Sequence, residues 1–102
     1  MEYNYYDANL NHETSKNDTL ECILSDLQNL YVEGSFLTLV NDEKEILHFM
    51  IEKDDKWLVD IPKMEEGIYF QKYTDIEEVC VLTEKFYNKE SIDTSKFKVG
   101  KF

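Results

Sequence analysis

The feature that most constrains this chain is a change in the spacing of its apolar residues, once near position 35 and again near position 75. In the segments next to these points, 15–34 and 74–90, apolar residues recur every three or four positions, as on one face of a helix. Between them, apolar residues alternate with others, as in strands whose two faces meet different surroundings. The alternating section contains the runs SFLTLV, EILHFMIE, KWLVDIP and GIYFQKY. These runs predict four strands.

Short polar connections join the four runs. They are NDEK at 41–44, DD at 54–55 and KMEE at 63–66. Connections of this length make antiparallel hairpins the expected arrangement, so the strands should form a meander. Pro62 falls at the end of the third run, where its missing N–H group costs little.

Two segments of helical spacing flank the meander. The first, within 15–34, carries a stripe of apolar residues at Leu20, Ile23, Leu24, Leu27, Leu30 and Tyr31. The second spans 74–90, and Thr74 with Glu77 fits a capping box at its start. Residues 2–9 resemble a short strand, and the alternation of Phe97 and Val99 with lysines is typical of an edge strand.

These patterns together predict one α+β domain over residues 1–102. Its antiparallel sheet should have four or five strands in a meander, packed with an N-terminal and a C-terminal helix. The expected core residues are Leu24, Leu27, Leu39, Leu47, Phe49, Val59, Phe70, Val79 and Phe86. Trp57, which lies among acidic residues, should pack partly into the sheet, whereas Asp54, Asp55 and Asp60 should stay hydrated because unpaired charges are expensive to bury.

The charge balance is strongly acidic. The chain has 22 acidic and 11 basic residues, a net charge of −11, and every basic residue is a lysine. It therefore lacks the bidentate guanidinium that reads phosphate and guanine, and its negative field repels nucleic acid and anionic membranes. No apolar run approaches the roughly 20 residues of a membrane-spanning helix. We therefore expect a protein partner, not nucleic acid or a membrane.

Residues that carry catalytic chemistry do not form a recognisable motif. The possible metal ligands His12, His48, Cys22 and Cys80 are scattered, and three glycines leave no phosphate-binding loop. No nucleophile elbow is present, so we expect no enzyme, no metal and no cofactor. The N-terminal segment lacks the basic and apolar regions of a signal peptide, which predicts a cytoplasmic protein with free cysteines.

The order of elements resembles that of a known group of proteins. An early helix TLECILSDLQNL, the acidic strands EILHFMIEKDDKWLVDIP, the strand GIYFQKY and the late helix DIEEVCVLTEKFYN follow one another from about residue 17 onward. This order is similar to that of the small cytoplasmic immunity proteins encoded beside bacterial polymorphic toxins. The tail departs from that pattern, which closes on a tryptophan where this chain has Phe102. The resemblance implies a protein that binds a cognate toxin domain, often a nuclease or deaminase, and blocks its active site.

Acidic charge is consistent with such a partner, because toxins that act on nucleic acid carry basic clefts. The contact with the partner is predicted on the acidic hairpin connections and the exposed face of the strands. The nominated residues are Asp42, Glu43, Asp54, Asp55, Asp60, Glu65 and Glu66. Three alternatives remain open at this point. The acidic residues can simply keep the protein soluble, the chain can be an anti-CRISPR-like phage protein that mimics DNA, or it can be a small enzyme or ligand-binding domain.

Overall fold

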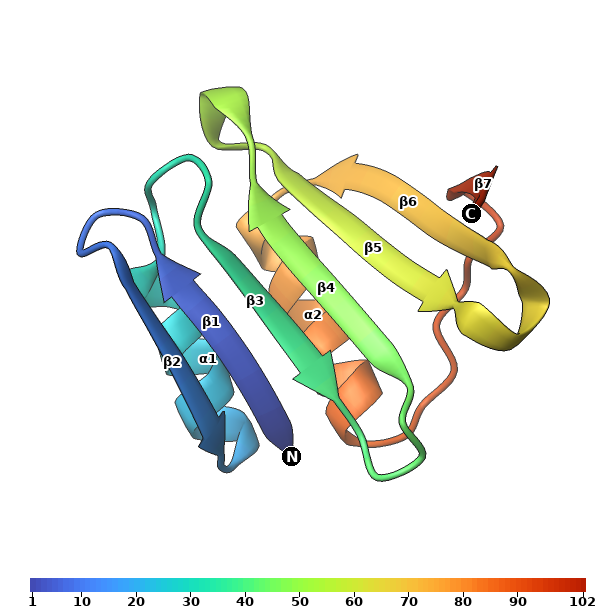
Figure 1. Cartoon of the computed structure of the whole chain (residues 1–102), viewed down its shortest axis with the longest axis horizontal. Coiled ribbons are helices and arrows are strands. Elements are labelled where there is room, and N and C mark those ends of the chain that lie inside the picture. The colour runs from blue at the N-terminus through green and yellow to red at the C-terminus, as the bar shows by residue number, and fades with distance from the viewer.

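A computed structural model describes all residues from 1 to 102 and shows one antiparallel sheet of seven strands with both helices on the same face (Figure 1). The strands are β1 (Glu2–Asp7), β2 (His12–Asn17), β3 (Phe36–Val40), β4 (Ile46–Ile51), β5 (Trp57–Lys63), β6 (Ile68–Thr74) and β7 (Lys98–Lys101). The helices are α1 (Leu20–Asn29) and α2 (Ile76–Tyr87), and the short 3-10 turns are η1 (Lys53–Asp55) and η2 (Met64–Glu66).

The spatial order of the strands is β2-β1-β3-β4-β5-β6-β7. Strands β3 to β6 form the predicted meander, in which each strand pairs with the next one along the chain. The hairpin of β1 and β2 joins the meander through β1, and α1 crosses from β2 back to β3. The α+β class is as predicted, but the predicted sheet of four or five strands is wrong because the sheet has seven.

Strand β2 is the element that the sequence pattern failed to indicate. Its sequence, HETSKN, has no large apolar residue, because β2 is an edge strand that contributes little to the core. Backbone pairing holds it to β1 along its full length. The side chain of Asn4 also donates a hydrogen bond of 2.8 Å to Glu13 Oε1. An edge strand that is held in this way shows no apolar periodicity in its sequence.

Helix α1 is tied to the β1–β2 hairpin by a small polar network. The Tyr3 hydroxyl donates a hydrogen bond of 2.7 Å to Asp26 Oδ2, and Lys16 Nζ lies 3.4 Å from the same oxygen. Burial, assisted by the bond to Asp26, raises the pKa of Tyr3 above its ordinary value. Tyr3 therefore stays protonated and acts as a donor between sheet and helix.

Helix α2 begins one residue later than the capping box predicted. Asp75 occupies the N-cap position and accepts a hydrogen bond of 2.9 Å from the backbone N–H of Glu78. Thr74 is instead the last residue of β6, where it pairs with Trp57, and its hydroxyl donates to the Glu78 carboxylate. Because Thr74 pairs with Trp57 in the sheet, Asp75 and not Thr74 caps helix α2.

The core lies between the sheet and the two helices, and fifteen buried apolar residues form one cluster there. We call this side of the sheet the covered face. Six of the nine predicted core residues are buried, and Leu24, Phe70 and Phe86 are half-buried against the cluster. Trp57 is 4% exposed, which confirms that its indole packs into the sheet. An unpaired carboxylate would be costly on such a face.

Candidate functional site

The opposite side of the sheet, which we call the uncovered face, has no helix over it (Figure 1). It is formed by the residues that alternate with the buried ones along the strands. On β3 to β6 these residues are Phe36, Thr38, Val40, Ile46, His48, Met50, Leu58, Asp60, Pro62, Tyr69, Gln71 and Tyr73. Most of them are half-buried by their neighbours, and Tyr73 is 61% exposed.

A row of polar side chains crosses the middle of the uncovered face. Thr38, His48, Asp60 and Gln71 are successive cross-strand partners in this row. Thr38 Oγ1 lies 2.7 Å from His48 Nδ1, within hydrogen-bonding distance. Burial lowers the pKa of His48 below its ordinary value, although the neighbouring Asp60 carboxylate opposes this effect. His48 is therefore mainly neutral at pH 7.

Apolar and aromatic side chains lie on both sides of this polar row. One side carries Tyr6, Phe36, Met50, Leu58 and Tyr73, and the other carries Val40, Ile46, Pro62 and Tyr69. The rings of Tyr6 and Phe36 stack with their centroids 5.6 Å apart. Tyr69 packs so closely over Gly100 that an added Cβ there would collide with its ring. The uncovered face is consequently an apolar surface interrupted by one polar row.

The predicted contact residues surround this face and do not form one cluster. Asp42 and Glu43 lie in the connection from β3 to β4, and Glu65 and Glu66 lie in η2 at the same end of the sheet. Asp54 and Asp55 belong to η1, at the opposite end, as the positions of the connections in Figure 1 show. Asp60 lies between the two ends on β5. All except Asp60 are exposed.

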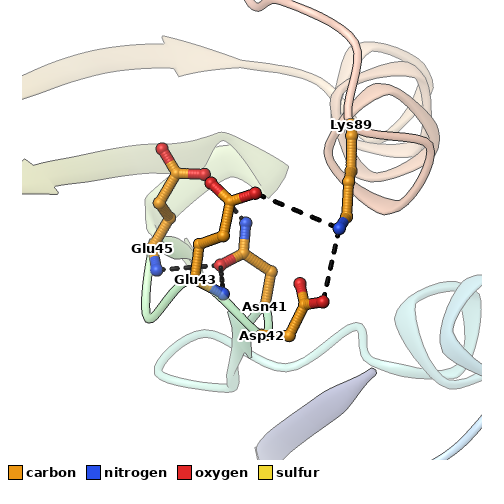
Figure 2. Close-up of polar contacts among 5 residues, drawn as sticks. All are labelled: Asn41, Asp42, Glu43, Glu45 and Lys89. Atoms are coloured by element: carbon orange, nitrogen blue, oxygen red, sulfur yellow. Dashed lines mark hydrogen bonds and ion pairs between the residues drawn. The ribbon is translucent and has the colours of Figure 1, made fainter.

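Asn41 fixes the shape of the β3–β4 connection (Figure 2). It is 7% exposed, and its Oδ1 accepts hydrogen bonds from the backbone N–H groups of Glu43 at 3.0 Å and Glu45 at 2.9 Å. Its Nδ2 donates to Glu45 Oε1 at 2.9 Å. A short asparagine side chain that bonds its own backbone is typical of tight turns. Asn41 therefore sets the direction of the neighbouring carboxylates.

Lys89, which follows α2, partly neutralises this end of the sheet (Figure 2). Its Nζ lies 3.3 Å from Asp42 Oδ2 and 4.0 Å from Glu43 Oε1. The hydrogen bond and charge of Lys89 hold the pKa of Asp42 below its ordinary value. Glu65 and Glu66 have no lysine within 4.0 Å. Among the carboxylates of these two connections, only those of η2 therefore have no lysine partner.

A groove of about 550 Å³ lies between these two connections. Its apolar lining includes Ile46, Pro62, Met64 and Phe86, and its charged lining is Glu43, Glu45, Glu65 and Glu66 together with Lys44 and Lys63. Met64 is 68% exposed. The groove therefore combines apolar, acidic and basic side chains.

Asp60 is the predicted residue whose surroundings differ most from expectation. It was expected to be hydrated, but it is half-buried, and its Oδ1 has neither solvent contact nor a hydrogen-bond partner. The apolar rows around it were not identified as a surface from the sequence. The sequence signal that could have identified them is the run EILHFMIE, in which both sets of alternating residues on β4 contain apolar side chains.

The remaining chemistry-bearing residues do not assemble into a site. No group of three or more His, Cys, Asp or Glu side chains is placed to hold a metal ion. Cys22 and Cys80 are free and half-buried, and burial raises the pKa of the Cys80 thiol. Neither helix has the length and apolar character needed to cross a bilayer. Comparison with protein-family models, curated proteins and solved structures finds no match to this chain.

Proposed function

We propose that this protein is a cytoplasmic immunity protein that binds a basic bacterial toxin domain and covers its active site. The observation that carries the proposal is the uncovered face, an apolar surface with unpaired carboxylates beyond both ends of its strands. An apolar centre with a charged rim is the usual composition of a protein-binding surface. In this proposal the chain contributes binding and no catalysis.

The dimensions of the molecule support a partner of ordinary size. Its principal extents are 35 × 30 × 23 Å, and the uncovered face lies across the two longer ones. A standard protein interface buries about 800 Å² on each partner, which a face of this outline can supply. A partner that covers the whole face would reach the acidic connections at both ends. Under this proposal, all seven predicted residues would lie in or around one interface.

The charge distribution supports a basic partner. Only five of the 22 acidic side chains have a lysine within 4.0 Å, namely Asp26, Asp42, Glu43, Glu45 and Glu78. The remaining carboxylates create a negative field that accelerates encounter with a positive surface. A toxin that cleaves or modifies nucleic acid has such a surface around its active site. The carboxylates would occupy the positions of substrate phosphates.

The direct test is to co-express and purify the chain with the product of the gene immediately upstream and to measure complex formation. The proposal predicts a stable complex and protection of cells that express that product. Failure to bind and to protect would contradict the immunity function. In that case, capture of a nucleic-acid-binding bacterial defence complex would support the anti-defence alternative.

The role of the acidic rim can be tested with two matched charge reversals. Glu65→Lys with Glu66→Lys changes η2, whereas Glu77→Lys with Glu84→Lys makes the same charge change on exposed positions of α2. The first pair should slow association, and the loss should shrink as salt rises, because rim charges mainly steer encounter. The α2 pair should have a smaller effect. Equal slowing by both pairs would show that only net charge matters.

A further inference from the structure

Asp60 lies near the centre of the uncovered face, and its charge has no partner within the chain. No lysine comes within 4.0 Å of its carboxylate, and Oδ1 is shielded from solvent without receiving a hydrogen bond. Among the lysines of the seven strands, only Lys98 lies on the uncovered face. It belongs to β7, where it pairs with Gln71, and β6 separates it from Asp60. Asp60 is therefore an acceptor that the fold itself leaves unused.

The fold has no need of an acid at this position. Aspartate is disfavoured in strands, and a half-buried carboxylate without a donor lowers stability. The neighbours along β5 are Leu58 and Pro62, so an apolar side chain would suit the surface equally well. A polar group that lowers the stability of the fold is a candidate for a role in binding.

The surroundings of Asp60 have the composition of a binding hot spot. His48 and Gln71 flank it on the adjacent strands, and their outer neighbours on the face include Met50 and Tyr73. Apolar residues around a central charged group keep water away from the contact, which strengthens the central interaction. A second acceptor without a partner, Asn4 Oδ1, lies on the same polar row.

We propose that Asp60 is a subsite for one cationic side chain, arginine or lysine, presented by the partner protein. The positive end would bond the Asp60 carboxylate, and its apolar stem would lie on Met50, Leu58 and Tyr73. A second copy of this chain is a poor occupant, because each copy carries a charge of −11 and the face offers only Lys98 at its edge. The identity of the partner as a toxin rests on the proposed function, but the subsite does not.

The subsite can be tested without the partner by nuclear magnetic resonance. The probe is the amide of N-acetylarginine, with the amide of N-acetylglutamine as a neutral control of similar shape. The arginine probe should shift the resonances of Asp60, His48 and Gln71 in a saturable way, and the glutamine probe should not. Asp60→Asn should abolish the response, whereas Asp54→Asn, which removes the same charge in an exposed turn, should preserve it.

Two results would overturn the subsite. One is an arginine response spread over the acidic connections and unchanged in Asp60→Asn, which would indicate diffuse charge attraction. The other is a set of shifts on the uncovered face that follows protein concentration and not the probe, which would indicate self-association. The thermal unfolding of Asp60→Asn, measured in parallel, shows whether a lost response reflects lost folding.

Measurements with the bound toxin domain separate this inference from the proposed function. Asp60→Asn should raise the dissociation rate about 10- to 100-fold with little change in association, because the contact is central and desolvated. A toxin that binds wild type and Asp60→Asn equally would overturn the subsite and leave the immunity function standing. An arginine response without any toxin complex would support the subsite and contradict the immunity function.

Discussion

The two faces of the sheet are built from the same strands but follow different rules. On β4, Leu47 and Phe49 point toward the helices and are fully buried, whereas His48 and Met50 point the other way and are half-buried. The strand residues buried on the covered face are almost all apolar, while the uncovered face carries a polar row between two apolar ones. The comparison shows that the covered face is explained by folding alone, and the uncovered face is not.

Hydrogen bonding of buried polar side chains also differs between the interior and the uncovered face. In the interior, Thr83 is fully buried and its hydroxyl donates to the Val79 carbonyl at 2.8 Å. Ser35 is also fully buried, and its Oγ accepts a hydrogen bond of 2.9 Å from the Ala8 N–H. The two buried side-chain atoms without partners, Asn4 Oδ1 and Asp60 Oδ1, both belong to the uncovered face. Both unused acceptors therefore belong to the face that no helix covers.

The largest expected difference between the faces concerns stability. Phe49→Ala should lower the free energy of unfolding by about 3 to 5 kcal/mol, because it leaves a cavity in the core. Met50→Ala, one residue away on the uncovered face, should cost about 1 kcal/mol or less because a half-buried side chain loses fewer contacts. Urea unfolding of both variants provides the measurement. Similar losses for the two would show that both faces are packed alike.

A smaller effect is expected at a buried polar group that has its partners. Asn41→Ala removes the acceptor for two backbone N–H groups and should destabilise the protein by about 1 to 3 kcal/mol. Glu45→Ala removes the carboxylate that accepts from Asn41 Nδ2 but leaves both backbone hydrogen bonds of Asn41 Oδ1 in place, so it serves as the matched control in the same unfolding experiment. If both variants unfold like wild type, Asn41 does not hold the β3–β4 connection in place.

The opposite sign is expected at Asp60, where the partner is missing. Asp60→Leu should raise the free energy of unfolding by about 1 kcal/mol, because it removes an unpaired acceptor from an apolar surface and improves strand propensity. The same variant should lose affinity for the partner. A destabilised Asp60→Leu would mean that the carboxylate contributes to the fold, and the contrast between the faces would weaken.

The smallest effect concerns pH. Burial lowers the pKa of His48 in the folded protein, so the unfolded chain binds the His48 proton more readily than the folded one. The free energy of unfolding is therefore unaffected by this proton above the ordinary histidine pKa near 6.5. It declines as pH falls through that region. The stability difference between wild type and His48→Gln should therefore change between pH 7.5 and 5.5, to the disadvantage of wild type at low pH. A constant difference would show that His48 is not desolvated.

The elements with strong apolar periodicity could be predicted from sequence. The meander, both helices and the burial of Trp57 follow from alternation and helical spacing, because packing against one core imposes those patterns. Strand β2 could not be predicted, since an edge strand held by backbone pairing carries no such pattern. The capping position of α2 was missed because sheet pairing engages Thr74.

The candidate site was only partly predictable for a similar reason. The acidic connections are visible in sequence because short polar segments separate the runs, and Asp42 and Glu65 lie in such connections. The arrangement of those connections at two ends of the sheet depends on strand direction, which makes Asp54 distant from Asp42. The shielding of Asp60 depends on neighbours from three strands, and no local pattern encodes it.

The most direct test of this account is the footprint of the upstream gene product on the chain, measured by methyl-labelled nuclear magnetic resonance of the complex. If the partner covers the uncovered face, the methyl signals of Ile46, Met50 and Leu58 should shift. The signals of Leu24 on α1 and Val81 on α2 should stay unchanged, because both helices lie on the other side of the sheet. A footprint on the helices, with the uncovered face unperturbed, would contradict the account.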